Sequence, residues 1–104
     1  MSKYIIQKIK LLYLTFVGYT ARWTSFHPEH WTTTDVSEWL EYVCRLHSIP
    51  TGDIPDLRDS FMTVDGQTLV SLDAEDFQQR TTKYGEFLRN IFETMCSDGN
   101  FFLS

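Results

Sequence analysis

The segment from Thr32 to Leu46 places the strongest constraint on the fold, because its pattern fits one amphipathic helix and no strand. Its apolar residues recur at i, i+3, i+4 and i+7, the spacing that puts side chains on one face of an α-helix. This apolar set consists of Val36, Trp39, Leu40 and Val43. We therefore expect these residues to lie in a core, with the Trp39 indole buried rather than exposed as a binding anchor.

The start of this helix is marked by Thr32 and, three residues later, Asp35. A hydroxyl and a carboxylate at this spacing can satisfy the first free amide groups of a helix reciprocally, as a capping box. Asp35 also carries its negative charge near the positive end of the helix dipole. The sequence thus predicts both the position of the helix and its first residue.

After Ser48 the chain reads as short helices separated by breaks. Two prolines and a glycine make residues 48–55 a loop, and residues 56–61 can form a short helix that carries Leu57 and Phe61 inward. We interpret Val64–Gly66 as a tight turn in which the glycine allows a positive φ.

The last third of the chain repeats this pattern. Asp73 and Asp76 predict a second capping box before a short helix that carries Phe77. Residues 84–95 predict the longest later helix. No segment alternates with period two, so the predicted class is all-α. The predicted core residues are Val36, Trp39, Leu40, Val43, Leu69, Phe77, Leu88, Ile91 and Phe92.

Charge divides the chain into two parts. The net charge is −5, but residues 1–22 carry four basic side chains and no acid, whereas residues 23–104 have a charge of −9. We therefore predict a basic N-terminal segment, 1–22, and one domain, 23–104. An acidic body of this kind is poorly suited to binding the phosphates of nucleic acids.

The N-terminal segment carries Ile5, Ile9, Leu12 and Phe16 at helical spacing. Its uninterrupted apolar run, residues 11–17, is short for a signal peptide and far shorter than the about 20 residues that span a bilayer. We expect an amphipathic helix that packs on the domain or lies on a partner or a membrane surface.

Several short motifs together resemble a known family. "HPEHW", "DVSEWL", "DGQTL", "DAEDF" and "YGEFL" occur in the order and spacing of the pointed domain of ETS-family transcription factors, a SAM-like bundle of about five short helices. The opening "WTSFHPEHWT" and the ending "DGNFF" are most similar to the epithelium-specific ETS subgroup. The resemblance covers residues 23–102 and leaves the N-terminal segment outside.

The resemblance implies a nuclear, non-enzymatic module that binds proteins: itself, or another SAM or pointed domain. ETS factors bind DNA through a separate basic domain. Only eight residues follow Cys96, so we expect no direct nucleic-acid binding by this chain. No Ser-Pro or Thr-Pro dipeptide is present, which argues against phosphorylation after docking of a MAP kinase. The alternative function is a membrane-peripheral or cytoplasmic adaptor anchored by residues 1–22.

Motifs for catalysis and cofactors were not found. The sequence contains no G-x-S-x-G, P-loop or dinucleotide fingerprint. His27-x-x-His30 and Cys44-x-x-His47 have the spacing of zinc ligands, but sites of this sort ordinarily use more cysteines. We therefore expect no enzyme activity, no metal and no cofactor.

The candidate interaction surfaces follow from charge. An acidic middle and a basic region around the start of the last helix could join head to tail between copies, because they are complementary in sign. Met62 and Val64 are the candidates for an apolar centre, although either could belong to the core. The acidic set is Asp53, Asp56, Asp59 and Asp65; the basic set is Arg80, Lys83 and Arg89.

Replacing Trp39 with alanine tests the core assignment. Truncating a buried tryptophan typically costs about 3–5 kcal/mol, a large share of the roughly 5–15 kcal/mol that stabilises a small domain. We expect Trp39→Ala to be largely unfolded at 37 °C by circular dichroism. A cooperative melt close to the wild-type temperature would place Trp39 outside the core.

Overall fold

The computed structural model describes residues 21–97, and these form a bundle of helices in which no strand occurs. The five α-helices of residues 21–97 are α2 (Thr33–Leu46), α3 (Ile54–Ser60), α4 (Gly66–Ser71), α5 (Ala74–Arg80) and α6 (Gly85–Ser97). The same residues contain three short 3₁₀ helices, η1 (Arg22–Ser25), η2 (Pro28–His30) and η3 (Thr51–Asp53). The predicted all-α bundle is confirmed. The predicted N-terminal helix lies outside the described residues.

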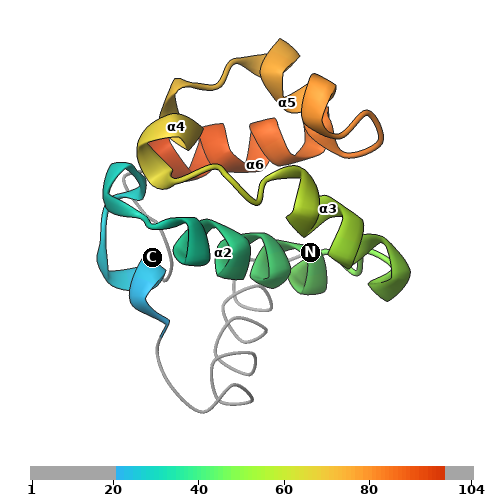
Figure 1. The fold of residues 1–104 in the computed structure, drawn as a ribbon, viewed down its shortest axis with the longest axis horizontal. Helices are drawn as coiled ribbons and strands as arrows, with labels where there is room; N and C mark the ends of the chain where they lie inside the picture. The colour runs from blue at the N-terminus through green and yellow to red at the C-terminus, as the bar shows by residue number, and fades with distance from the viewer. Residues whose placement is uncertain (1–20, 98–104) are drawn as a thin grey trace.

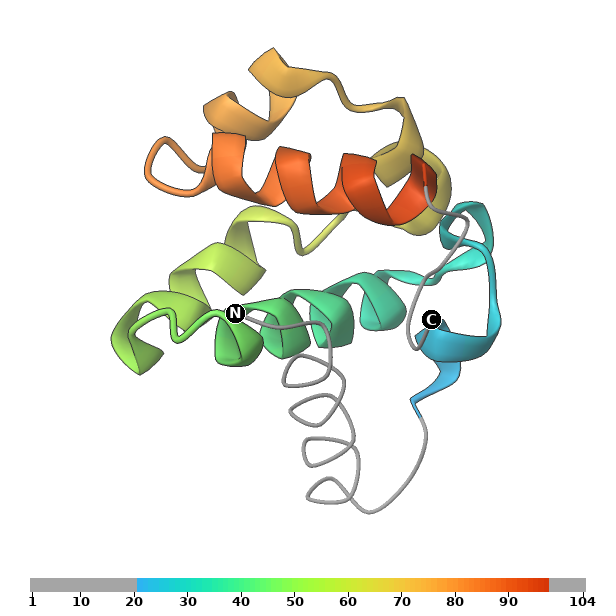
Figure 2. The same ribbon diagram turned by 180° about the vertical axis from the view of Figure 1, so that it is seen from behind.

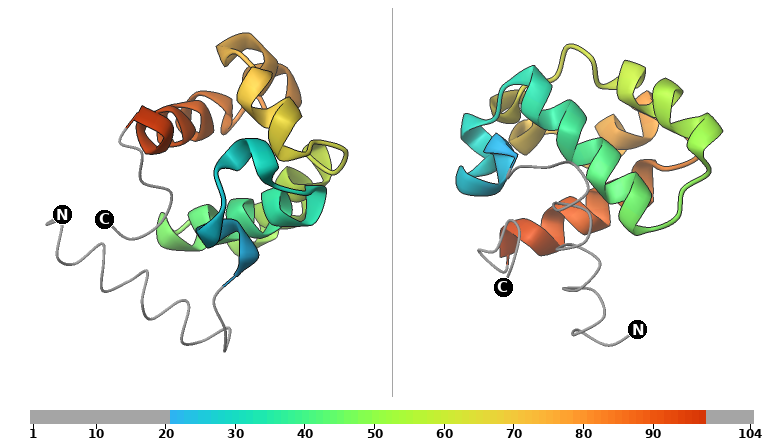
Figure 3. Two further views of the ribbon diagram at one scale, coloured as in Figure 1. Left: turned by 90° about the vertical axis from the view of Figure 1, so that its left-hand side faces the viewer. Right: turned by 90° about the horizontal axis from the view of Figure 1, so that it is seen from below.

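The two longest helices, α2 and α6, form the centre of the bundle. In Figures 1 and 2 helix α6 lies above α2, and α5 lies above α6. Helix α3 packs against α2, and α4 packs against η2. The short helices η1 and η2 lie at the N-terminal end of α2 (Figure 3). No described helix has the length and apolarity needed to cross a membrane.

Helix α2 begins as predicted. The Thr32 side chain accepts a hydrogen bond from the Asp35 amide (3.1 Å), and the Asp35 carboxylate accepts one from the Thr32 amide (2.9 Å). Asp35 is only 2% exposed and also pairs with the Arg22 guanidinium. Arg22, the last residue of the predicted N-terminal segment, thus contacts the start of α2.

A column of aromatic rings joins the helices through the core. Trp39 lies at its centre, with ring centroids 5.8 Å from Trp31 and 5.6 Å from Phe92. Phe77 and Phe61 continue the column towards α3. Eight of the predicted core residues are buried, and Ile91 is half-buried against them.

The residues before α2 contribute more to this core than the sequence indicated. Trp23 and Trp31 are buried, with their rings 5.8 Å apart and edge to face. The Trp31 indole N–H donates to two backbone carbonyls, those of Trp23 and Phe26, each at 3.0 Å. A buried indole keeps its hydrogen bond in this way, and the η1–η2 segment is held against α2.

Gly66 corrects the predicted turn at residues 64–66. Gly66 is the first residue of α4 and lacks the predicted positive φ. Glycine is required there for space instead, because an added Cβ would lie 1.7 Å from the Pro28 carbonyl oxygen and 2.7 Å from the Trp31 amide nitrogen. The Gly66 amide donates to the Trp31 carbonyl at 2.8 Å. Backbone thus packs directly on backbone where α4 meets η2.

Two element boundaries near residue 54 differ from those predicted from the sequence. Residues 51–53 form η3, and α3 begins at Ile54 inside the predicted loop. Pro55 does not prevent this, because a proline in the first turn of a helix lacks only an amide that would have no intrahelical partner. The second predicted capping box, between Asp73 and Asp76, is present at the start of α5.

Alanine at Gly66 tests the close approach of α4 and η2. The new methyl group would collide with backbone atoms that cannot rotate away, so we expect a loss of about 3 kcal/mol or more in unfolding free energy. Gly52 is the matched control, because nothing lies within 4 Å of a Cβ added there. Gly52→Ala should change stability by less than about 1 kcal/mol. Equal melting temperatures for the two variants in thermal denaturation would contradict this account.

Candidate interaction surface

The acidic and basic residues predicted to join different copies meet within one molecule. Asp53 ends η3, and Lys83 and Tyr84 lie in the turn before α6. Lys83 Nζ is 3.1 Å from the Asp53 carboxylate, and the Tyr84 hydroxyl donates to the same oxygen. This three-residue contact, which we call the Asp53 cluster, joins the start of α3 to the start of α6.

The cluster changes the protonation equilibria of its members. The Tyr84 hydrogen bond, with Lys83 second, lowers the pKa of the Asp53 carboxyl below its usual 3.8. The same hydrogen bond raises the pKa of the Tyr84 hydroxyl above 10. Asp53 raises the pKa of Lys83 above 10.5. The cluster therefore holds one carboxylate, one ammonium group and one neutral phenol at neutral pH.

A shallow hollow of about 220 Å³ opens beside the cluster, and we call it the corner hollow. It is lined by Asp53, Asp56, Leu57, Ser60, Arg80, Thr81, Lys83 and Tyr84. Arg80 is held there by a hydrogen bond from its guanidinium to the Ser60 carbonyl (3.2 Å) and by the Phe61 ring, 5.8 Å away. Four of the predicted interaction residues, two acidic and two basic, thus share one hollow with balanced charge.

Arg89 has a structural role that the sequence did not indicate. Its guanidinium pairs with Glu93 at 3.1 Å and donates to the Leu72 carbonyl at 3.2 Å. It therefore ties α6 to the segment between α4 and α5. The basic region predicted around the last helix is largely used inside the fold.

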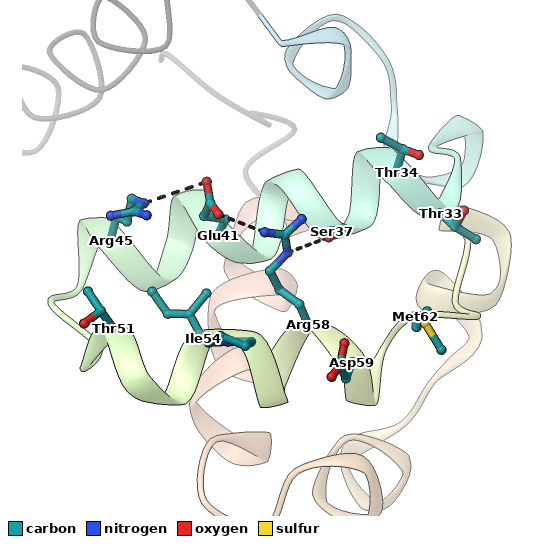
Figure 4. Close-up of a pocket in the computed structure, with 11 residues that line it drawn as sticks. Thr33, Thr34, Ser37, Glu41, Arg45, Thr51, Ile54, Arg58, Asp59 and Met62 are labelled. Carbon is teal, nitrogen blue, oxygen red and sulfur yellow. Dashed lines mark hydrogen bonds and ion pairs between the residues drawn. The ribbon is translucent and has the colours of Figure 1, made fainter.

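A second, larger depression lies between α2 and α3 and has a volume of about 540 Å³ (Figure 4). Arg58 reaches across this α2–α3 groove from α3, donating to the Ser37 hydroxyl (2.7 Å) and to Glu41 (2.9 Å). Arg45 approaches the other Glu41 oxygen at 3.8 Å. These ion pairs span the middle of the groove and nearly cancel its charge.

Met62 and Asp59 lie at one end of the groove, as the close-up shows (Figure 4). Met62 is 67% exposed, whereas Val64 is 0% exposed. The structure thus separates the two apolar candidates, because Met62 is exposed and Val64 belongs to the core. The Val64 amide donates a hydrogen bond to the Phe61 carbonyl in the turn after α3. Val64 is therefore not an interaction residue.

Asp65, another of the acidic candidates, caps α4. Its carboxylate accepts a hydrogen bond from the Thr68 amide at 2.9 Å, and this bond lowers the pKa of the Asp65 carboxyl. Capping of α4 by itself accounts for an aspartate at position 65. Of the acidic residues near the groove, Asp59 remains without an ion pair to any described residue.

The four residues with zinc-like spacing do not form a site. Between residues 21 and 97 no three His, Cys, Asp or Glu side chains are grouped so that they could hold a metal ion. Cys44 is buried, and burial raises the pKa of its thiol to about 11. The His47 ring packs edge-on against Phe87 instead.

Sequence reasoning missed Tyr84 and Arg58, which bind the start of α3 to α6 and the middle of α3 to α2. In the sequence Tyr84 was only the first residue of the predicted last helix, and Arg58 entered only the count of net charge. Their partners are 31 and 17 residues away in the chain, a separation at which no periodic pattern relates two residues.

Comparison with known proteins gives one consistent result. Residues 18–99 match the model of the sterile alpha motif (SAM)/Pointed domain. Human ETS-related transcription factor Elf-5 is 32% identical over 82 residues, which are 79% of this chain and 30% of the relative. The bovine Elf-5 is 30% identical over the same length, and the chicken transcriptional regulator Erg is 33% identical over 57 residues, 55% of this chain and 11% of that protein. No solved structure matches significantly.

Removing the Tyr84 hydroxyl tests the Asp53 cluster. Tyr84→Phe deletes the donor to Asp53, so we expect its melting temperature at pH 7 to fall by a few degrees. A carboxyl whose pKa is lowered by folding stabilises the fold above pH 3.8 and loses this contribution as pH falls through the lower folded pKa. The difference between wild type and Tyr84→Phe should therefore shrink below pH 3.8.

Lys83→Gln is the control for this comparison. Lys83 is 71% exposed, and exposed ion pairs contribute little, so this variant should melt nearer to wild type. If the Tyr84→Phe difference persists unchanged at low pH, the Tyr84 hydroxyl stabilises the fold through an interaction other than its hydrogen bond to the Asp53 carboxylate.

Proposed function

The chain belongs to the sterile alpha motif (SAM)/Pointed domain family, and we propose that it is the non-enzymatic protein-interaction module of a nuclear ETS-type transcription regulator. The family is one of non-catalytic modules, and the ETS relatives support both the regulatory role and the nuclear location. The chain spans about a third of the Elf-5 relatives. DNA binding would belong to a separate domain of such a protein.

The observation that carries the proposal is Met62. Apolar side chains in the described part are mostly buried, yet this one is 67% exposed at the mouth of a groove. A flexible, polarizable methionine beside a free carboxylate, Asp59, suits a contact that is apolar at its centre and charged at its edge. The apolar centre required for association is thus supplied by Met62 and not by Val64.

The kind of partner follows from how the basic residues are used. Residues 21–97 contain thirteen acidic and six basic side chains, and all six basic groups bind a carboxylate or a backbone carbonyl of the same chain. Head-to-tail self-association would have to break such pairs. We therefore favour a heterotypic partner, a SAM or pointed domain with basic residues around an apolar pocket, over tight self-association.

A negative charge introduced at Met62 tests the proposal. Met62→Glu should abolish capture of protein partners, measured by quantitative mass spectrometry after affinity purification from nuclear extract, with no change in melting temperature. Val70→Glu is the matched control, because Val70 is also exposed (42%) but lies on α4, outside the groove. Identical partner sets for wild type and Met62→Glu would rule out this surface.

Sedimentation distinguishes the two kinds of association. We expect wild type to be monomeric, or weakly associated only at low salt, because exposed charges are screened over about 10 Å at 0.1 M salt. A stable, salt-resistant polymer that Met62→Glu abolishes would instead show that this surface binds a second copy.

A further inference from the structure

The Asp53 cluster contains the one described tyrosine whose hydroxyl lies at a surface hollow. The other tyrosine of residues 21–97, Tyr42, is buried in α2. Tyr84 is half-buried, ends the turn between α5 and α6, and lines the corner hollow. Its hydroxyl reaches the carboxylate of Asp53 across 31 residues of sequence. A chemical change at this oxygen would act directly on the contact between the start of α3 and the start of α6.

We propose that Tyr84 is a phosphorylation site whose modification opens the Asp53 cluster. A tyrosine kinase would transfer the γ-phosphoryl group of ATP to the Tyr84 oxygen. The new P–O bond replaces the bond between the γ-phosphorus and its bridging oxygen, ADP leaves, and the phenolic proton passes to the catalytic base of the kinase. This inference does not depend on which partner the module binds.

The physical consequence follows from the charges that surround the oxygen. Phosphorylation removes the donated hydrogen bond and adds about −1.5 to −2 charges, next to the carboxylate that had accepted that bond. Lys83 is 71% exposed and pairs with Asp53 at 3.1 Å, so it can turn to the phosphate and leave Asp53 with neither partner. The phosphate on Tyr84 and the adjacent Asp53 carboxylate repel each other, and the contact between the starts of α3 and α6 therefore loosens.

The same change alters the character of the surface. The corner hollow carries Asp53 and Asp56 against Arg80 and Lys83, so its formal charge is balanced before modification. A phosphate would make it strongly negative. The modification therefore weakens the contact between the starts of α3 and α6. It also makes the corner hollow favour binding partners with basic side chains.

The first measurement asks whether a kinase can reach the Tyr84 hydroxyl in the folded chain. The full chain and a synthetic peptide of residues 78–91 are incubated with Mg-ATP and a purified tyrosine kinase selected for activity on that peptide, and products are mapped by mass spectrometry. Turn residues open at low cost, so we expect the folded chain to be modified at Tyr84 no more than about tenfold more slowly than the peptide. Modification of the peptide but not of Tyr84 in the folded chain would overturn the proposal.

The second measurement is the effect on stability. Protein carrying phosphotyrosine only at position 84 is compared with unmodified protein by thermal denaturation. We expect a fall of about 5 °C in melting temperature, the shift produced by losing a contact of this size in a small domain. An unchanged or raised melting temperature would show that Lys83 and the N-terminus of α6 accommodate the phosphate, and would refute the opening.

Asp53→Asn provides the matched control. An asparagine keeps the shape of the side chain but removes the charge that faces the phosphate, so phosphorylation should lower the melting temperature of this variant by less than it lowers that of wild type. An equal fall in both backgrounds would mean that repulsion from Asp53 does not cause the effect. Tyr84→Phe, treated in parallel with kinase, should show no modification in the peptide spanning residue 84.

Discussion

The packing of Trp39 between Trp31 and Phe92 is the contact on which the rest of the bundle depends. It joins α2 to α6, which is distant in sequence, and also to the segment just before α2. Aromatic side chains bury large areas and gain additional stabilisation from tilted or edge-to-face contacts. In a domain with so few helical turns, this column supplies much of the apolar burial, and the short helices α3, α4 and α5 acquire fixed positions by packing around it.

Electrostatics imposes the second constraint. The described part has about twice as many carboxylates as basic groups, and the basic groups are used to hold elements together: Arg22 on Asp35, Arg58 on Glu41, and Lys83 on Asp53. What remains for a partner is a negatively charged surface on which Met62 is the most exposed of the large apolar side chains of residues 21–97. A scarce basic side chain that binds within its own molecule is less available to a second copy, and this favours a heterotypic contact.

The candidate surface was only partly accessible to sequence reasoning. Charge counting selected Asp53, Asp56, Arg80 and Lys83, and these four residues line one hollow. It assigned the acidic and the basic residues to two different surfaces that could join head to tail between copies. The start of α3 in fact lies beside the start of α6, and this proximity depends on the path of the chain through helices α4 and α5, which no local pattern describes.

The sequence by itself determined the features that arise within a single turn or helix. Thr32 with Asp35, and Asp73 with Asp76, form their capping boxes between residues three apart, and the apolar face of α2 follows from a helical repeat. Three features were decided only by the tertiary structure: the lack of space for a side chain at Gly66, the burial of Val64 beside an exposed Met62, and the ion pair of Lys83 with Asp53. The physical reason is range: a cap or a periodic face involves neighbours whose spacing the backbone sets, whereas a contact with Pro28 or Asp53 exists only after separate helices have packed on a common core.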